Sequence, residues 1–368
     1  MILVVLGTRP EIVKMASVIG SFQKSHIHYE IARVMQHYDW KMSGQFLEEL
    51  GYPKTDHVVY VDSSSQASQM SAAAVGLERT ILKCRPNSVL VQGDTNTVLA
   101  AALAAVKLQV SVCHVEAGLR SYDLRMPEEH NRRIVDHVSS FLFAPTTHAA
   151  ETLTDENVWG RIGITGNTVI DACLEFMKTA IETSSILDSI RFDRFALATI
   201  HRAESVDHER TLRTIVKILI GCPLPVVFPV HPRTMKRLKS SGLIGKLRSS
   251  ENIQLMQPAS YLDLLRLLKE CAFILTDSGG IQEEASAPNI RKFTYVLRRY
   301  TDRPESVKAG FARVMGTDDS KSVLRQLRLD ARRESKLPRK SPYGDGRAGV
   351  RIARLLKSVP FVYGQLYR

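Results

Sequence analysis

The chain has 368 residues, of which 50 are Lys or Arg and 38 are Asp or Glu, so its formal charge is +12. This length suits about two domains. Apolar residues make up 44% and charged residues 24%, ordinary globular values that exclude a disordered or collagen-like chain. The sequence contains nothing near the roughly 20 consecutive apolar residues of a membrane helix. Its apolar start lacks a basic leader and a cleavage site, and predicts a first strand.

The cysteines and the positive charge set further expectations. Five widely spaced cysteines without a C-x-x-C pair indicate reduced thiols in a cytoplasmic protein, with no metal site. The basic excess raises the alternative of a nucleic-acid-binding protein. Much of it lies in residues 321–340, without interleaved aromatic residues, so solvated helix faces explain it better. We expect no specific nucleic-acid partner and no membrane partner.

Apolar, β-branched runs alternate with helical spacing along the whole chain. The runs predict strands at residues 2–6, 29–35, 58–61, 88–92, 110–115 and 141–144, then at 195–200, 226–230, 252–256, 272–276 and 292–297. Helical spacing occupies residues 11–23, 66–83, 97–107, 208–219 and 261–269, and one long helix is expected within 167–188. This alternation predicts two α/β domains with parallel sheets, joined at a hinge near residues 170–190.

The first strand is followed by a segment that is suited to bind an anion. The sequence GTRPE at 7–11 places a glycine turn before a helix, with Arg9 in its first turn and Lys14 further along. Both side chains are candidates to face an anion at the helix N-terminus. An ordinary strand–glycine–helix junction is the alternative.

Three carboxylates follow predicted strands or precede a helix in the first half. Asp94 stands in the QGDT turn, Glu116 follows the strand at 110–115, and Glu128 begins a helix together with Glu129. Such a group is suited to acid–base chemistry. Asp94 as a helix N-cap is the alternative, although Thr95 also suits that role. A charge at the helix start is the structural role most easily given to Glu129.

Two strand ends in the second half carry candidate phosphate ligands. His201 follows one strand and is either a phosphate donor, a proton shuttle or a structural histidine. His231, in PVHP, is a weaker candidate, because a hydrogen-bonded turn residue explains it equally well. The Ser278-Gly279-Gly280 turn leads from a strand into a helix, a junction that binds phosphate oxygens. Glu284, one turn into that helix, is a candidate to bind ribose hydroxyls.

Neither a P-loop nor a dinucleotide-binding glycine motif occurs. Other motifs, in order, make the chain closely resemble the non-hydrolysing UDP-N-acetylglucosamine 2-epimerases. They are GTRPEIVKM at 7–15, QH at 36–37, QGDT at 92–95, HVEAGLRS at 114–121, MPEEHNRR at 126–133, FAPT at 143–146, TGNTVIDA at 165–172, HRAE at 201–204, PVHPRT at 229–234, TDSGGIQEEA at 276–285, DRPE at 302–305 and SPYGDGRAG at 341–349.

The resemblance implies a GT-B fold, with two Rossmann-like parallel-sheet domains facing a central cleft. It implies a first domain over 1–170, a second over 171–354, and a last helix at 355–368 that returns to the first. Members interconvert UDP-GlcNAc and UDP-ManNAc by anti elimination of UDP through 2-acetamidoglucal and re-addition. The family is usually dimeric, so a homodimer is expected, and no metal or redox cofactor is implied. The QH segment matches the region where bacterial members bind a second, activating UDP-GlcNAc; we leave this activation open.

The resemblance also implies roles for individual residues. The diphosphate would be held by Arg9, Lys14, His201, Ser278, Gly279 and Gly280, and the ribose by Glu284. The catalytic set would be Asp94, Glu116, Glu128 and His201. Asp94 and Glu116 are favoured as proton-transfer groups, with Glu128 supporting them. The chain departs from the family pattern at 286–302, where Arg299 replaces an acid and Asp302 a glutamate.

Other enzymes stay open as alternatives. One is an epimerase of a related UDP-2-acetamido sugar, such as a diacetamido-uronic acid. Another is a GT-B glycosyltransferase, although three carboxylates exceed what simple transfer requires. A hydrolysing epimerase is the last, and the GTRPE opening argues against it.

Overall fold

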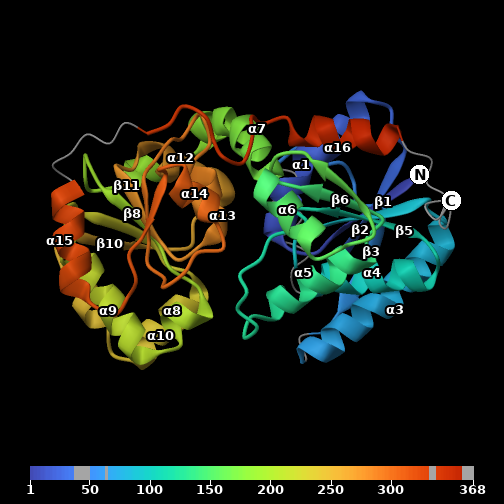
Figure 1. The fold of residues 1–368 in the computed structure, drawn as a ribbon. Helices are drawn as coiled ribbons and strands as arrows, with labels where there is room; N and C mark the ends of the chain where they lie inside the picture. The colour runs from blue at the N-terminus through green and yellow to red at the C-terminus, as the bar shows by residue number, and fades with distance from the viewer. Residues whose placement is uncertain (37–49, 63–64, 331–336, 359–368) are drawn as a thin grey trace. The chain divides into compact units, whose positions relative to one another are not determined.

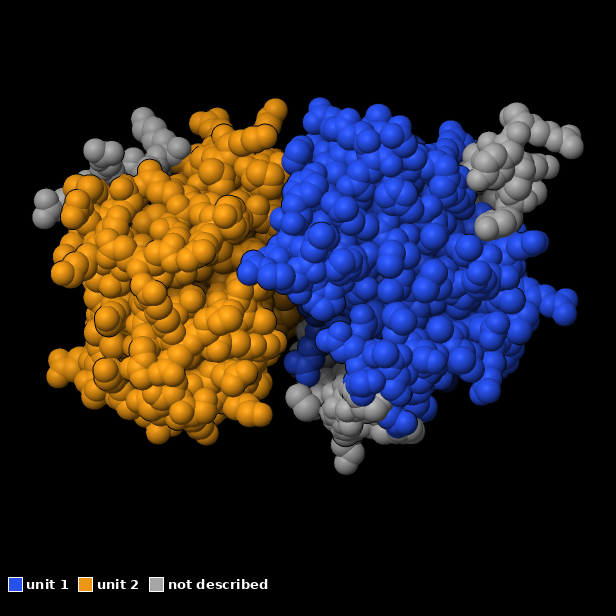
Figure 2. Space-filling view, turned by 60° about the horizontal axis from the view of Figure 1, so that its bottom comes forward, with its two compact units in different colours: residues 1–172, 344–368 blue, residues 173–343 orange. Residues whose placement is uncertain are grey.

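A computed structural model describes residues 1–36, 50–62, 65–330 and 337–358. Two compact units make up the chain. Unit 1 comprises residues 1–172 and 344–368, and unit 2 comprises residues 173–343 (Figures 1 and 2). Among the described residues, no helix is long and apolar enough to cross a membrane.

Unit 1 is built on a seven-stranded sheet in the order β3-β2-β1-β4-β5-β6-β7, and every neighbouring pair is parallel. The strands are β1 (Ile2–Leu6), β2 (Tyr29–Gln36), β3 (His57–Val61), β4 (Ser88–Gln92), β5 (Ser111–Val115), β6 (Phe141–Ala144) and β7 (Arg161–Ile164). Its helices include α1 (Arg9–Lys24), α3 (Gln66–Cys84), α4 (Asn96–Lys107), α5 (Pro127–Val138) and α6 (Thr147–Asp155). Strands β1, β4 and β5 are buried along their whole length, as continuous apolar runs predict for a sheet covered on both faces.

Unit 2 repeats the plan with a six-stranded sheet, ordered β10-β9-β8-β11-β12-β13 and again parallel at every pairing. The strands are β8 (Ala196–Thr199), β9 (Val226–Pro229), β10 (Ile253–Met256), β11 (Phe273–Thr276), β12 (Thr294–Val296) and β13 (Ala312–Val314). The helices are α8 (Ala203–Val206), α9 (Glu209–Ile220), α10 (Pro232–Ser240), α11 (Ile244–Arg248), α12 (Tyr261–Glu270), α13 (Gly279–Ala285), α14 (Pro304–Lys308) and α15 (Ser320–Asp330), with a 3-10 turn at Ile186–Ser189. The expected pair of parallel-sheet α/β domains is therefore confirmed.

The chain returns to unit 1 through α16 (Ala348–Lys357), which packs along α1. Its first turn is held by Asp171 in α7 (Thr168–Thr183), whose carboxylate accepts hydrogen bonds from the backbone N–H groups of Ala348 (3.1 Å) and Gly349 (2.9 Å). The chain crosses between the units at 172/173 and 343/344, whereas the sequence placed these crossings at 170/171 and 354/355. Residues 359–368 lie outside the described part.

Each sheet has one point where the strand order reverses direction. In unit 1 it lies between β1 and β4, and in unit 2 between β8 and β11. Ligands of open α/β sheets bind outside the carboxyl ends of the strands at such a point. The turn after β1 begins at Gly7, and the turn after β4 holds Gly93 and Asp94. The topology therefore directs attention to the segments that the sequence singled out.

Candidate active site

Glu11 joins the two turns at the reversal point of unit 1. Its buried carboxylate accepts hydrogen bonds from the backbone N–H of Gly7 (2.6 Å) and from the hydroxyls of Thr8 (3.0 Å) and Thr95 (2.8 Å). Burial raises the pKa of Glu11, although these hydrogen bonds oppose the rise. The sequence assigned Glu11 no role. The structure shows that it fixes the start of α1, where Arg9 lies exposed, against the turn that carries Asp94.

Glu116 occupies a strained position directly after β5. Its backbone is in the left-handed region, with φ +69°, and its side chain is only 6% exposed. Lys14 Nζ on α1 contacts both carboxylate oxygens, at 2.6 and 2.8 Å. The side-chain amide of Gln92, at the end of β4, donates to the same carboxylate. Left-handed backbone is rare for residues with a side chain and clusters at functional sites.

Asp94 lies in the turn after β4 and is paired with Arg132 of α5. Thr95, and not Asp94, caps α4, because its hydroxyl accepts the N–H of Val98. The structural alternative for Asp94 is therefore wrong, and the role predicted for Thr95 is confirmed. Asn131 adds a hydrogen bond from its amide to the Asp94 carbonyl, 2.9 Å long. Asp94 thus has a fixed backbone and a partly exposed carboxylate that is paired with Arg132.

The two glutamates at the start of α5 have different environments. Glu128 is exposed, and among the described residues no hydrogen bond or ion pair joins it to Asp94 or Glu116. Glu129 is fully buried and accepts hydrogen bonds from the N–H and hydroxyl of Ser121, both 2.8 Å long. It also pairs with Arg132 at 3.0 Å. Glu129 therefore anchors the loop after β5. The sequence had assigned it only the role of a negative charge at the start of the helix.

A buried network of hydrogen bonds and ion pairs holds the turn that carries Asp94. The ring of His114 on β5 bridges the carbonyl of Gly93 (2.8 Å from Nε2) and the carboxylate of Asp136 (2.7 Å from Nδ1). Asp136 also pairs with Arg120, which in turn binds Glu156. Burial alone would raise the pKa of Asp136, but the hydrogen bond from His114 and the charge of Arg120 lower it overall. The sequence did not reveal this network, which fixes the Gly93–Asp94 turn through the carbonyl of Gly93.

Asp277 organises the reversal point of unit 2. Its carboxylate, directly after β11, accepts hydrogen bonds from the backbone N–H groups of His201 (3.1 Å) and Arg202 (2.9 Å), which follow β8. The His201 ring lies 5.6 Å from the ring of His231, centroid to centroid. Burial lowers the pKa of both imidazoles. The Nδ1 of His231 accepts the N–H of Arg233 and caps α10, as the turn interpretation predicted.

The Ser278-Gly279-Gly280 turn packs against a cluster of charges. A side chain at Gly279 would come within 3.1 Å of the Asp302 carboxylate, so glycine permits this close approach. Asp302 is buried among three guanidinium groups, which belong to Arg202, Arg298 and Arg303. Arg303 also pairs with Glu283 on α13, the helix that carries the buried Glu284. Within the altered 286–302 region, Arg298 and Asp302 therefore belong to a buried ion-pair network.

In unit 1 the buried carboxylate of Glu116 is thus paired with Lys14, and in unit 2 the rings of His201 and His231 lie close together. The family model for UDP-N-acetylglucosamine 2-epimerase matches residues 21–357. The chain belongs to this family. The resemblance inferred from the motifs is confirmed, and so is the class of enzyme, since the family consists of isomerases.

Relatives of known name cover nearly the whole chain. A UDP-N-acetylglucosamine 2-epimerase of Methanocaldococcus jannaschii is 40% identical over 96% of this chain and 98% of its own length. A UDP-2,3-diacetamido-2,3-dideoxy-D-glucuronate 2-epimerase of Pseudomonas aeruginosa is 36% identical over 96% of this chain and 99% of its own length. The named relatives in this family therefore act on two different classes of UDP-sugar.

Solved structures of family members share the fold. The Methanocaldococcus jannaschii enzyme in complex with UDP-GlcNAc and UDP matches with a TM-score of 0.88 and 39% identity, over 97% of this chain and 99% of that one. The Neisseria meningitidis UDP-GlcNAc 2-epimerase bound to UDP-GlcNAc matches with a TM-score of 0.86 and 31% identity, over 97% of this chain and 100% of that one. These matches confirm the GT-B type of fold, with two parallel-sheet α/β domains, that the sequence predicted.

Proposed function

We propose that this chain interconverts UDP-GlcNAc and UDP-ManNAc by eliminating and re-adding UDP. The observation that carries the proposal is Glu116, a buried carboxylate in left-handed backbone that Lys14 and Gln92 hold in place. In a chain of this family, such a group is suited to move the proton at C2 of the sugar. The named relatives that act on this sugar nucleotide support the choice of substrate.

The chemistry explains why a carboxylate and cations are needed together. The C2 proton is not next to a carbonyl and is barely acidic, so it leaves only while the C1–O bond to UDP breaks. The carboxylate takes the proton, the C2–H electron pair forms the C1–C2 double bond, and UDP departs with the C1–O pair. Groups that stabilise the departing diphosphate lower the barrier to this step. Inversion then requires a proton from the opposite face, and we assign the two transfers to Asp94 and Glu116, with Glu128 in support.

We assign the UDP part of the substrate to a second set of residues. His201 and the Ser278-Gly279-Gly280 turn would bind the diphosphate, and Glu284 the ribose. The buried Asp277 supports this assignment because it fixes the backbone of His201. Arg9 and Lys14 would add positive charge toward the diphosphate. Lys14, paired with Glu116 here, would neutralise that carboxylate until the leaving diphosphate develops its charge.

Product analysis with two substrates tests the proposal. The purified full chain is incubated with UDP-GlcNAc, and in parallel with the UDP-diacetamido-glucuronate of the Pseudomonas relative. We expect UDP-ManNAc from the first and no turnover of the second. Turnover of the uronate alone would replace the proposed substrate. Release of free ManNAc with UDP would replace the non-hydrolysing reaction.

We further propose a cytoplasmic homodimer that takes UDP-GlcNAc or UDP-ManNAc as its partner molecule. The family resemblance is the support for the dimer. Light scattering of the purified chain tests it, and a monomer mass at working concentration would refute it. Activation by a second UDP-GlcNAc stays a question for kinetics, because His37 lies outside the described residues.

A further inference from the structure

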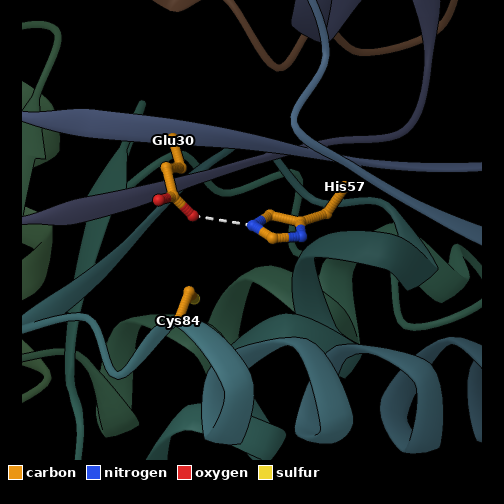
Figure 3. A group of neighbouring side chains, drawn as sticks. All are labelled: Glu30, His57 and Cys84. Atoms are coloured by element: carbon orange, nitrogen blue, oxygen red, sulfur yellow. Dashed lines mark hydrogen bonds and ion pairs between the residues drawn. The ribbon is translucent and has the colours of Figure 1, made fainter.

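Three side chains with metal-binding atoms meet in unit 1, away from the residues discussed above. They are Glu30 on β2, His57 at the start of β3 and Cys84 at the end of α3 (Figure 3). The Nε2 atom of His57 lies 2.7 Å from a carboxylate oxygen of Glu30. One ligand atom from each of the three residues lies within 4.8 Å of the others. Within the described part of the chain, this is the one such grouping of histidine, cysteine and carboxylate side chains.

The topology explains why residues so distant in sequence meet. Strands β2 and β3 are parallel, and Glu30 and His57 both lie near their amino ends. Helix α3 connects β3 to the parallel strand β4, so it runs back along the sheet and ends at the amino edge with Cys84. The Lys14–Glu116 pair belongs to the turns at the carboxyl edge. The two groups therefore lie at opposite edges of one sheet.

Side-chain alternation places Glu30 and His57 on the face of the sheet that α3 covers. Ala32 and Val34 of β2, like Val59 and Val61 of β3, belong to the apolar cluster beneath α3. Glu30 and His57 share their parity along the strands and so point to the same face. Cys84 packs against the edge of that cluster. A half-buried carboxylate, imidazole and thiol thus converge where the apolar core ends.

We propose that Glu30, His57 and Cys84 form a binding site for a zinc ion. Zinc takes thiolate, imidazole and carboxylate ligands together, whereas magnesium and calcium prefer oxygen ligands alone. Zinc–ligand bonds of about 2.0–2.3 Å at tetrahedral angles place ligand atoms roughly 3.3–3.7 Å apart. Adjustments of about 1 Å in these side chains reach that geometry from the spacing observed.

Charge balance supports the same assignment. A thiolate and a carboxylate neutralise a divalent ion bound with one neutral imidazole, so the partly buried site carries no net charge. A bound zinc ion deprotonates a coordinating thiol. Three protein ligands leave a fourth position for water.

Zinc at this site would tie β2, the edge strand β3 and the end of α3 together. It would stabilise unit 1, because a ligand that binds only the folded state adds to stability. The epimerisation would not depend on it, since the proposed catalytic groups lie at the other edge of the sheet. This role is independent of the proposed function.

Zinc titration of the full chain tests the proposal. The protein is stripped with a chelator and titrated with zinc chloride in a calorimeter. We expect one equivalent to bind and the melting temperature to rise. Cys84→Ser and His57→Ala should weaken binding at least 10- to 100-fold, the loss typical even of residues that only support a ligand. The matched control is His148→Ala, an exposed histidine 3.9 Å from Glu151.

A thiol reagent supplies a second readout. Cys84 is half-buried and the other four cysteines are buried, so the reagent should modify Cys84 first in the folded protein. Zinc should slow this modification at least tenfold. If Cys84→Ser unfolds the chain, Glu30→Gln replaces it as the test. Absence of stoichiometric binding, or equal zinc affinity of the wild type and the ligand variants, overturns the proposal.

Discussion

The ammonium group of Lys14 and the carboxylate of Glu116 form a two-pronged ion pair, with distances of 2.6 and 2.8 Å. The pair joins the first helix to a residue that is 102 positions later in the chain. Both side chains are nearly buried, at 13% and 6% exposure. A buried carboxylate with a cation on one side and Gln92 on another has little freedom to move. This arrangement is suited to hold a proton acceptor in one place.

Replacing the carboxylate of Glu116 should strongly reduce turnover while sparing the fold. Glu116→Gln keeps the shape and loses the basic oxygen, so we expect epimerisation to fall about 10²- to 10⁴-fold. UDP affinity, measured by calorimetry, should change only a few-fold. The control is Glu78→Gln, an exposed glutamate on α3. Full activity of Glu116→Gln would remove this residue from the mechanism.

Gly118 is a position where any side chain should destabilise unit 1. Its φ is +85°, and an added Cβ would lie 2.3 Å from the carbonyl oxygen of Ala149. We expect Gly118→Ala to lower the free energy of unfolding by at least about 2 kcal/mol, from left-handed strain plus this clash. Urea denaturation measures the loss. Gly20→Ala in α1 is the matched control, because its Cβ would meet nothing within 4 Å and should be neutral or stabilising.

Asp302 should be essential to the stability of unit 2. Its side chain is 1% exposed, and its removal would leave the charges of Arg202, Arg298 and Arg303 without this carboxylate. Asp302→Asn should therefore cost about 3–5 kcal/mol, the loss typical of breaking a buried ion pair. Asp318→Asn, which removes an exposed pair with Arg299, should cost less than about 1 kcal/mol. Equal losses in the two variants would contradict the role given to Asp302.

The histidine pair in unit 2 should make stability depend on pH. Burial lowers the pKa of His201 and His231 in the folded state, so the unfolded chain binds protons at higher pH than the folded chain. Stability is therefore unaffected above the unfolded pKa near 6.5 and falls as pH drops below it. Chemical denaturation at pH 7.5 and 5.5 measures this fall. It should shrink in His231→Asn, which keeps a capping acceptor but does not titrate, and an unchanged fall would contradict the assignment.

The sequence predicted most strands and the segments of the candidate site, because both have local signals. Buried parallel strands read as apolar runs, and each candidate segment begins where such a run ends. Strands β7 and β13 were missed because they are short and partly exposed and so lack that signal. The partners of the site residues were also missed. Arg132 lies 38 positions from Asp94, and Asp302 lies 100 from Arg202, so only the fold brings them together.

Proton NMR of the purified chain with UDP-GlcNAc in deuterated water tests the central claim most directly. If the reaction breaks the C2–H bond, the UDP-ManNAc formed carries deuterium at C2. Deuterium should also accumulate at C2 of the UDP-GlcNAc pool, because re-addition is reversible. UDP-ManNAc that keeps its original C2 proton would contradict proton transfer by these carboxylates.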